Sequence, residues 1–198
     1  MSAMISKAEQ AQRQRRALLD AARELFAARG YEATSTEEIV RSMGVSRGAL
    51  YHHFRNKAAL FEAVYQEQRA ALAHAISERI QVAEGASRRQ IMRTVCHAFI
   101  DTAADSSVQR ILFVDGPAVL SRNVIQEPDS ALRLLRQVFE PLMDEGVIGP
   151  QPLDLFLRLV WAMCFEAGLY IAHAADRATA RQEMVGILER LLTGLGRA

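Results

Sequence analysis

Residues 35–54 read STEEIVRSMGVSRGALYHHF, and this stretch decides the fold that we expect. Ser35 and Glu38 stand three residues apart, the spacing of a capping box, so a helix should begin directly after Ser35. Gly44 ends that helix after two turns, because glycine tolerates the left-handed backbone of a helix C-terminus. Ser46 can cap a second short helix directly after it. Two short helices joined by a three-residue turn form a helix-turn-helix.

The second short helix, Arg47–Phe54, has an apolar and a polar side. Leu50 and Phe54, four residues apart, are expected to face inward. The outward side keeps groups that bond to phosphates and base edges, namely Arg47, Gly48, Tyr51, His52 and His53. Arg47 suits the O6 and N7 acceptors of guanine, whereas Tyr51 and His52 suit phosphate oxygens. The pattern predicts a helix that enters the major groove of double-stranded DNA.

Further candidate DNA contacts flank these two helices. Lys57 begins the next helix, where free backbone N–H groups also favour phosphate. The cap residues Ser35, Thr36 and Ser46 carry hydroxyls that could be shared with the DNA backbone. A basic N-terminal tail either reaches the minor groove or the phosphates, or is a solvated terminus; it contains Lys7, Arg13, Arg15 and Arg16.

Almost every other segment has the periodicity of a helix, so the expected fold class is all-α. One helix should cover residues 12–29 and end at Gly30, and a long helix should begin at Lys57 behind the cap Asn56. Later helices are expected over residues 87–104, 108–114, 128–145, 153–173 and 179–195. Gly116-Pro117 should stop the second of these, and Pro141 should kink or break the third.

These helices divide into two expected domains. Residues 12–60 form a three-helix DNA-binding domain with the helix-turn-helix, and residues 61–198 form a helical domain for effector binding and dimerisation. Residues 149–152, Gly-Pro-Gln-Pro, are the clearest linker in the chain. The first 60 residues hold ten Lys and Arg against six Asp and Glu, although the whole chain has a net charge of only +1. Such a basic end suits contact with a polyanion.

The composition narrows the class of protein. The 198 residues are half hydrophobic, which is typical of a globular chain. Cys96 and Cys164 form neither a disulfide framework nor a zinc motif, so we expect a reducing cytoplasm, no metal and no cofactor. The N-terminus lacks an export signal. The apolar stretch 153–165 contains Arg158 and is expected to be too short to cross a membrane.

The last two expected helices have broad apolar stripes that suit either a homodimer interface or the core of the subunit, and we expect each helix to contribute to both. The stripes contain Leu153, Phe156, Leu157, Val160, Trp161 and Cys164 in the first helix, and Met184, Ile187, Leu188, Leu191, Leu192 and Leu195 in the second. Large apolar groups mixed with a few polar ones, among them His97, Arg110, Asp115 and His173, also suggest a pocket for a lipophilic or aromatic effector. Its candidate residues are Phe99, Phe113, Trp161, Phe165, Glu166 and Tyr170.

Residues 15–64 resemble the DNA-binding region of the TetR (tetracycline-repressor-like) family. The resemblance is carried by Gly30-Tyr31, the turn Gly44-Val45-Ser46, Leu50-Tyr51, Phe54 and Lys57. It implies a dimeric repressor of transcription that is not an enzyme, has a helical C-terminal domain and is released from a palindromic operator by a small molecule. It also implies DNA contacts at Thr36, Arg47, Gly48, Tyr51, His52, His53 and Lys57.

Two positions depart from the family pattern. Ala49 stands where threonine is frequent, and Glu37 stands where some members have a basic residue directed at a base. A carboxylate at that place would repel phosphate or accept a hydrogen bond from cytosine N4. The operator sequence therefore cannot be transferred from the family.

The sequence also offers signals for three other interpretations. Residues 44–48, GVSRG, match the GxSxG elbow of α/β-hydrolases, but that elbow needs a strand before its serine and a helix is expected here. A body that only dimerises, without an effector, would leave the DNA-binding prediction intact. A redox sensor would use Cys96 and Cys164, whose apolar neighbours favour inert buried thiols instead.

Overall fold

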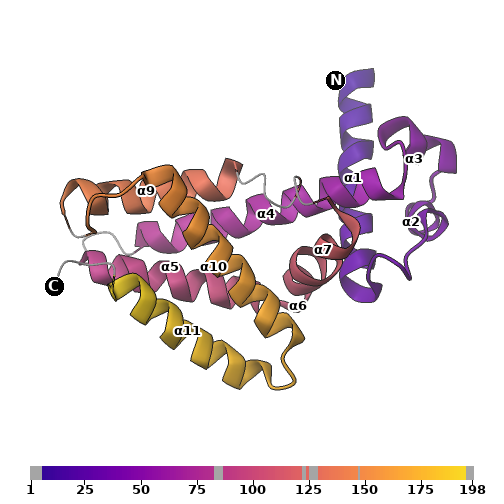
Figure 1. Cartoon of the computed structure of the whole chain (residues 1–198). Coiled ribbons are helices and arrows are strands. Elements are labelled where there is room, and N and C mark those ends of the chain that lie inside the picture. The colour runs from indigo at the N-terminus through magenta and orange to yellow at the C-terminus, as the bar shows by residue number, and fades with distance from the viewer. Residues whose placement is uncertain (1–5, 83–86, 122–123, 125–128, 147, 195–198) are drawn as a thin grey trace.

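The computed structural model describes residues 6–82, 87–121, 124, 129–146 and 148–194, and it confirms the all-α fold. Within these ranges the chain forms helices and no strand (Figure 1). The helices are α1 Lys7–Arg29, α2 Thr36–Met43, α3 Arg47–His53, α4 Lys57–Val82, α5 Arg88–Ala103, α6 Ser106–Val108, the π-helix η1 Gln109–Asp115, α7 Gly116–Val119, α9 Asp129–Asp144, α10 Leu153–His173 and α11 Arg177–Gly194.

The helices form two groups, which we call the head, α1–α3, and the body, α4–α11. The head lies at one end of the molecule, and α4 extends from it along the whole body (Figure 1). The first turns of α4 belong to the core beneath the head, because Phe61 packs edge-on against Phe26 of α1 at 5.2 Å between ring centroids. Farther along, α4 packs mainly against α5 and α9. One long helix thus contributes to both cores.

Helix α1 begins five residues earlier than the sequence predicts. Ser6 accepts a hydrogen bond from the backbone N–H of Glu9, and the Glu9 side chain accepts one from the N–H of Ser6. This capping box starts the helix at Lys7. Lys7, expected to lie in a tail before the helix, is therefore its first residue, and it shares the helix with Arg13, Arg15 and Arg16.

The expectation that Gly116-Pro117 stops a helix was wrong. The chain does not stop there but continues from η1 into α7, with Gly116 at a helical φ of −51°. Pro117 occupies the first turn of α7, a position at which its fixed φ is compatible with a helix. A Cβ on Gly116 would lie 2.6 Å from Cε2 of the buried Tyr65, so glycine serves close packing here.

Helix α9 contains Pro141 and nevertheless continues to Asp144, so the proline does not break it. Gly146 then reverses the chain at a φ of 68°, close to the expected end of the helix. Pro128, expected in the first turn of this helix, lies outside the described residues. The linker 149–152 is confirmed as non-helical.

Helix α10 has the predicted bounds, Leu153–His173. Its apolar part is longer than the stretch 153–165 that we expected to be too short for a membrane span. Its 21 residues and a mean hydropathy of 1.6 in its most apolar window are sufficient for a membrane span. The core helix of a folded bundle passes the same test, and 44% of this window is buried inside the protein. Helix α10 packs against α5, α9, α11 and η1.

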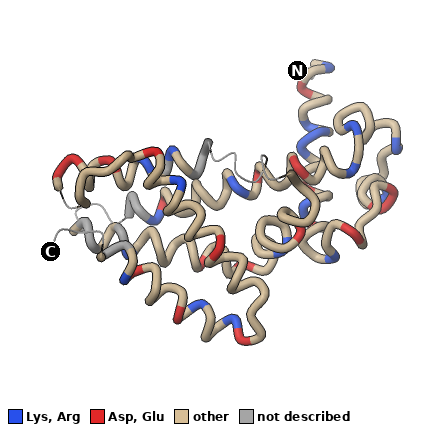
Figure 2. The backbone as a smooth tube through the Cα atoms, in the orientation of Figure 1, with Lys and Arg blue, Asp and Glu red and all other residues tan. Residues whose placement is uncertain are grey.

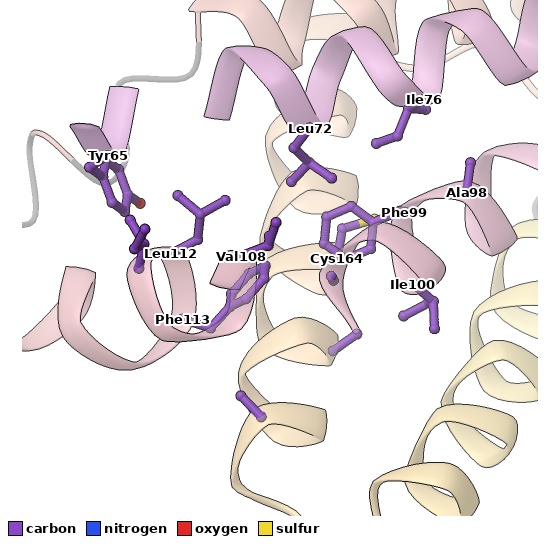
Figure 3. Close-up of a cluster of buried hydrophobic side chains, with 14 of the residues drawn as sticks. Tyr65, Leu72, Ile76, Ala98, Phe99, Ile100, Val108, Leu112, Phe113 and Cys164 are labelled. Carbon is purple, nitrogen blue, oxygen red and sulfur yellow. The ribbon is translucent and has the colours of Figure 1, made fainter. Parts of the chain in front are cut away.

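The core of the body lies between α4, α5, η1 and α10. Leu72 and Ile76 of α4 point toward Phe99 of α5 and Cys164 of α10 (Figure 3). Phe113 of η1 packs on Gly168 of α10, where a Cβ would approach its ring to 2.6 Å. This close approach brings the π-helix directly onto α10.

Candidate nucleic-acid interface

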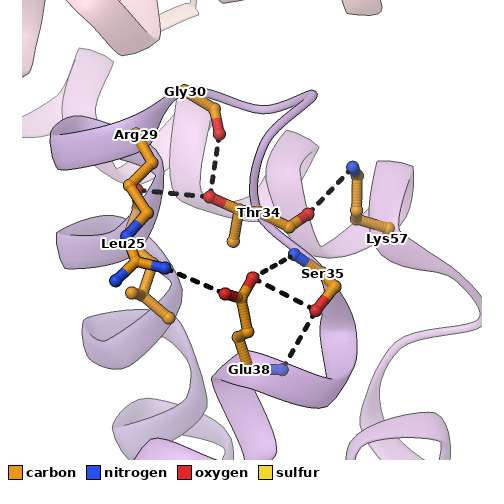
Figure 4. A network of polar contacts seen from close by, with 7 residues as sticks. All are labelled: Leu25, Arg29, Gly30, Thr34, Ser35, Glu38 and Lys57. Carbon is orange, nitrogen blue, oxygen red and sulfur yellow. Dashed lines mark hydrogen bonds and ion pairs between the residues drawn. The ribbon is translucent and has the colours of Figure 1, made fainter.

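The helix-turn-helix forms as its capping residues predict. Ser35 Oγ accepts the N–H of Glu38 at 3.2 Å, and the Glu38 carboxylate accepts the N–H of Ser35 at 3.0 Å (Figure 4). Gly44 has the left-handed φ of 65° that ends α2. Ser46 Oγ accepts the N–H of Ala49 at 3.3 Å and so begins α3. The hydroxyls of Ser35 and Ser46 therefore set the positions of the two helices.

Buried side chains determine which face of α3 points outward. Leu50 is fully buried and Phe54 nearly so, together with Ile39 and Val40 of α2. The opposite side of α3 exposes Arg47, Gly48, Tyr51 and His52. Lys and Arg also occur along α1 and around α3 (Figure 2). The structure thus brings these four of the expected residues together on one accessible surface.

Arg47 is held by its neighbours on this surface. Its Nη1 lies 2.8 Å from Oε1 of Glu37 in α2, and its Nη2 donates to the hydroxyl of Tyr51 at 3.4 Å. The guanidinium also lies 5.4 Å from the centroid of the Tyr51 ring. The Glu37 pairing was not foreseen, because residues ten apart in sequence meet only through the turn between α2 and α3.

Thr36 and His53 are less accessible than their positions suggest. Thr36 is buried, and its hydroxyl donates to the Glu37 carboxylate at 3.3 Å. His53 is half-buried, with Nε2 at 3.3 Å from Oε1 of Gln14 in α1. Burial, together with the nearby His52 and Arg15, lowers the pKa of His53. Both side chains therefore point partly toward the interior of the head and less toward the surface that would meet DNA.

Lys57 is engaged within the protein. Its Nζ donates to the carbonyl oxygen of Thr34 at 3.0 Å (Figure 4). It also donates to the carbonyl oxygen of Tyr31 at 2.8 Å and lies 4.0 Å from the Tyr31 ring centroid. Thr34 is itself buried and donates to the carbonyl of Gly30 at 2.8 Å. Lys57 thus fixes the turn between α1 and α2, a role that its sequence position did not indicate.

The same turn joins the head to the body. Asp115 of η1 accepts the backbone N–H of Tyr31 at 2.8 Å, and Arg110 Nη2 donates to the carbonyl of Arg29 at 3.0 Å. Arg110 also lies 3.7 Å from Asp115. The sequence suggested Arg110 and Asp115 as polar groups of the effector pocket and not as contacts of the head, because their partners here are more than 80 positions away in sequence.

The body contains an apolar cavity of about 30 Å³, roughly the space of one or two water molecules. Its lining residues are Arg69, Leu72, Ala73, Ile76, Val95, Phe99, Leu135, Trp161 and Cys164. Arg69 is the charged member, and it is 4% exposed. Its guanidinium lies 5.7 Å from the Trp161 ring centroid and donates to the carbonyl of Val124 at 3.2 Å.

The six residues expected to form one effector pocket are divided among three places. Phe99 and Trp161 line the cavity. Phe113 and Phe165 pack beside it, with ring centroids 5.4 Å apart. Glu166 and Tyr170 are exposed and line an open depression between α10 and α11. The apolar periodicity of α10 did not separate its cavity face from its outer face.

Two of the other interpretations can be compared with the geometry. Ser46 follows α2 rather than a strand, and its Oγ caps α3, so the GxSxG match lies in the turn of the helix-turn-helix. Burial raises the pKa of both Cys96 and Cys164 to about 12. Thiols with such pKa values are almost entirely protonated at neutral pH, which disfavours rapid oxidation.

Comparisons with known proteins agree with this architecture. The family model for bacterial regulatory proteins of the tetR family matches residues 18–64, and the model for the tetracyclin repressor-like C-terminal domain matches residues 89–195. The chain belongs to the TetR family. It is therefore a DNA-binding transcriptional regulator with a helix-turn-helix, and TetR-family regulators bind DNA operators, typically as dimers.

Individual TetR-family relatives match the whole chain or the head. The Transposon Tn10 TetC protein of Escherichia coli is 28% identical over 180 residues, 90% of each chain. The HTH-type transcriptional repressor Rv1474c of Mycobacterium tuberculosis is 44% identical over 59 residues, which are 30% of this chain and 32% of that protein. A solved TetR-family regulator from Pectobacterium atrosepticum has 26% identity and a TM-score of 0.85, with 98% of each chain covered.

Proposed function

We propose that the protein is a repressor that binds a palindromic operator as a homodimer and is released by a small lipophilic or aromatic effector. The polar outer face of α3 supports this proposal, because it places Arg47, Tyr51 and His52 on a helix whose opposite face is anchored in the head. Relatives of the head are named repressors. Residues 12–60 would form the DNA-binding domain and residues 61–198 the effector-binding and dimerisation domain.

Within the head we assign two kinds of role. Arg47 and Gly48 read base edges, and Tyr51 and His52 bind phosphate oxygens. The remaining candidates, Ser35, Thr36, Ser46, His53 and Lys57, hold these groups in place through the hydrogen bonds described above. The backbone N–H groups and side-chain donors of these five residues that form no hydrogen bond within the protein then contact phosphate.

Operator selection from sheared genomic DNA tests the central claim. The purified chain should enrich a small set of fragments that share a two-fold symmetric sequence, with half-sites one helical turn apart or a multiple of it. Fluorescence anisotropy on one enriched duplex then gives its affinity relative to a scrambled duplex. Equal binding to both duplexes would contradict sequence-specific regulation.

Much of the expected stripes is buried in the subunit core, namely Phe156, Leu157, Val160, Cys164 and Leu188. The dimer would therefore form through the apolar side chains that the last two helices leave exposed. Leu155 and Leu159 of α10 are 59% and 58% exposed, and Ile187 and Leu191 of α11 are also exposed. Exposed leucines in such a row are typical of a protein interface. Leu159→Glu should convert the dimer to a monomer in sedimentation velocity and reduce operator affinity. An unchanged sedimentation coefficient would place the interface elsewhere.

The effector would enter the apolar cavity between α4, α5, α9 and α10. At about 30 Å³ the cavity must widen to hold a ligand, so a ligand that binds the widened state better shifts the population toward it. Thermal-shift screening of lipophilic compounds should find ligands whose binding is weakened by Ala73→Met, which fills the cavity. The control is Ala71→Met on the exposed side of the same helix. Compounds that leave operator affinity unchanged would favour a body that only dimerises.

A further inference from the structure

An ion pair links α2 and α3 on the outer surface of the head. Glu37 Oε1 lies 2.8 Å from Arg47 Nη1, and Glu37 Oε2 accepts the Thr36 hydroxyl at 3.3 Å. On the other side, Arg47 Nη2 donates to the Tyr51 hydroxyl at 3.4 Å. Carboxylate and guanidinium are therefore each held by a second neighbour, which limits the directions in which Arg47 can point.

Stability does not explain this pair. The side chains of Arg47 and Glu37 are 62% and 47% exposed, and ion pairs in water contribute little to the free energy of folding. Glu37 is also not the capping acid of α2, since Glu38 fills that place. A carboxylate in the first turn of α2 favours that helix end with or without an arginine opposite, so the helix explains Glu37 but not its pairing with Arg47 on the surface that would face DNA.

The pair changes what Arg47 offers to DNA. A guanidinium has five N–H donors, and the two described contacts leave three, enough for a bidentate bond to guanine. The adjacent carboxylate cancels its charge, and phosphate attraction depends on that charge without regard to sequence. An arginine paired in this way keeps its hydrogen-bonding pattern and loses much of its general attraction to the backbone.

We propose that Glu37 is a specificity-determining residue that keeps Arg47 off the phosphates and directed at a guanine edge. It acts through Arg47 as a positioning residue, and it lowers affinity for all DNA while raising discrimination at one base pair in each half-site. This inference rests on the proposed DNA-reading role of α3.

The test compares full-length wild type, Glu37→Gln and Glu24→Gln. Glu24 is an exposed carboxylate of α1, so its variant makes the same charge change in the same head. Each protein is used to select from a randomised duplex library, and anisotropy then measures binding to a selected and a scrambled duplex over a range of salt concentrations. Circular dichroism melting verifies that each variant is folded.

Glu37→Gln should bind the scrambled duplex several-fold more tightly, because Arg47 becomes free to neutralise a phosphate. The plot of log affinity against log salt should steepen by about 0.9, the value for one added phosphate contact. Discrimination in favour of guanine at one position should fall several-fold, whereas Glu24→Gln should keep the wild-type base profile. In an Arg47→Ala background, Glu37→Gln should cause no further loss at that position.

A uniform gain in affinity with an unchanged base profile would overturn the inference, since Glu37 would then only repel DNA. Loss of discrimination that persists in the Arg47→Ala background would also overturn it, because Glu37 would then read the base directly. If the wild type selects no sequence at all, the proposed function itself fails, and this inference fails with it.

Discussion

The head and the body present their polar and apolar groups in opposite ways. In the head, the groups proposed to meet DNA are already exposed on α3, and hydrogen bonds from neighbouring side chains hold them in position. In the body, the apolar groups proposed to meet an effector enclose a cavity of about 30 Å³. The head can therefore bind without internal rearrangement, whereas the body must open first.

Removal of a buried aromatic ring from the head or from the body should have the largest effect on stability and on operator binding. Phe61→Ala and Phe113→Ala each empty a fully buried site, one under the head and one beside the cavity, and each should cost about 3–5 kcal/mol of unfolding free energy. Denaturant titration measures that loss. At equal folded fractions, Phe61→Ala should lose operator affinity and Phe113→Ala should retain it. Equal loss of operator affinity would show that the two cores do not act separately.

The thiols of the body should be nearly inert in the folded protein. With pKa values near 12 against an ordinary value of 9.0, Cys96 and Cys164 should react with iodoacetamide roughly a thousandfold more slowly at pH 8 than in denaturant. Because folding raises these pKa values, the stability that they contribute is complete below pH 9 and is lost as the pH rises toward 12. Mass spectrometry measures the labelling, and rapid native labelling would revive the redox interpretation.

Matched cap removals should give the smallest effects. Ser35→Ala in the head and Ser87→Ala in the body each remove the serine of an equivalent capping box. Each substitution should lower the free energy of unfolding by about 1 kcal/mol, as measured by thermal unfolding. Ser35→Ala should also weaken operator binding, since it frees the start of an eight-residue helix next to α3. Ser87→Ala should leave operator binding unchanged, and a similar loss in both variants would contradict the local role of the head cap.

Short-range signals explain why much of the fold could be predicted. Residues within three or four positions start and end α2, α3 and α5, so Ser35, Gly44 and Ser87 suffice to locate these helices. The same reasoning applied to Ser6 and Glu9 would have located the start of α1. Gly116-Pro117 was misread as a helix stop because the glycine serves close packing on Tyr65, a residue 51 positions away that no local pattern indicates.

The candidate site was predictable only where residues lie on one short helix. The outward side of α3 follows from the burial of Leu50 and Phe54. The partners of Arg47 and Lys57 could not be predicted, because Glu37 and the carbonyls of Tyr31 and Thr34 approach them through turns. The cavity depends on four helices, so periodicity found Phe99 and Trp161 but also included Glu166 and Tyr170, which face outward.

The number of residues in the π-helix η1 determines how the side chains on either side of it are oriented. A π-helix accommodates one residue more than an α-helix of the same span, as if a residue had been inserted. Phe113 and Asp115 lie on that segment, one against Gly168 of the body and the other on the N–H of Tyr31 in the head. Deletion of one residue would favour an α-helix there and turn the side chains on one side of the deletion by about 100° relative to those on the other side. An insertion or deletion in η1 would therefore displace a contact of the body and a contact of the head, whereas one in a surface loop would disturb neither.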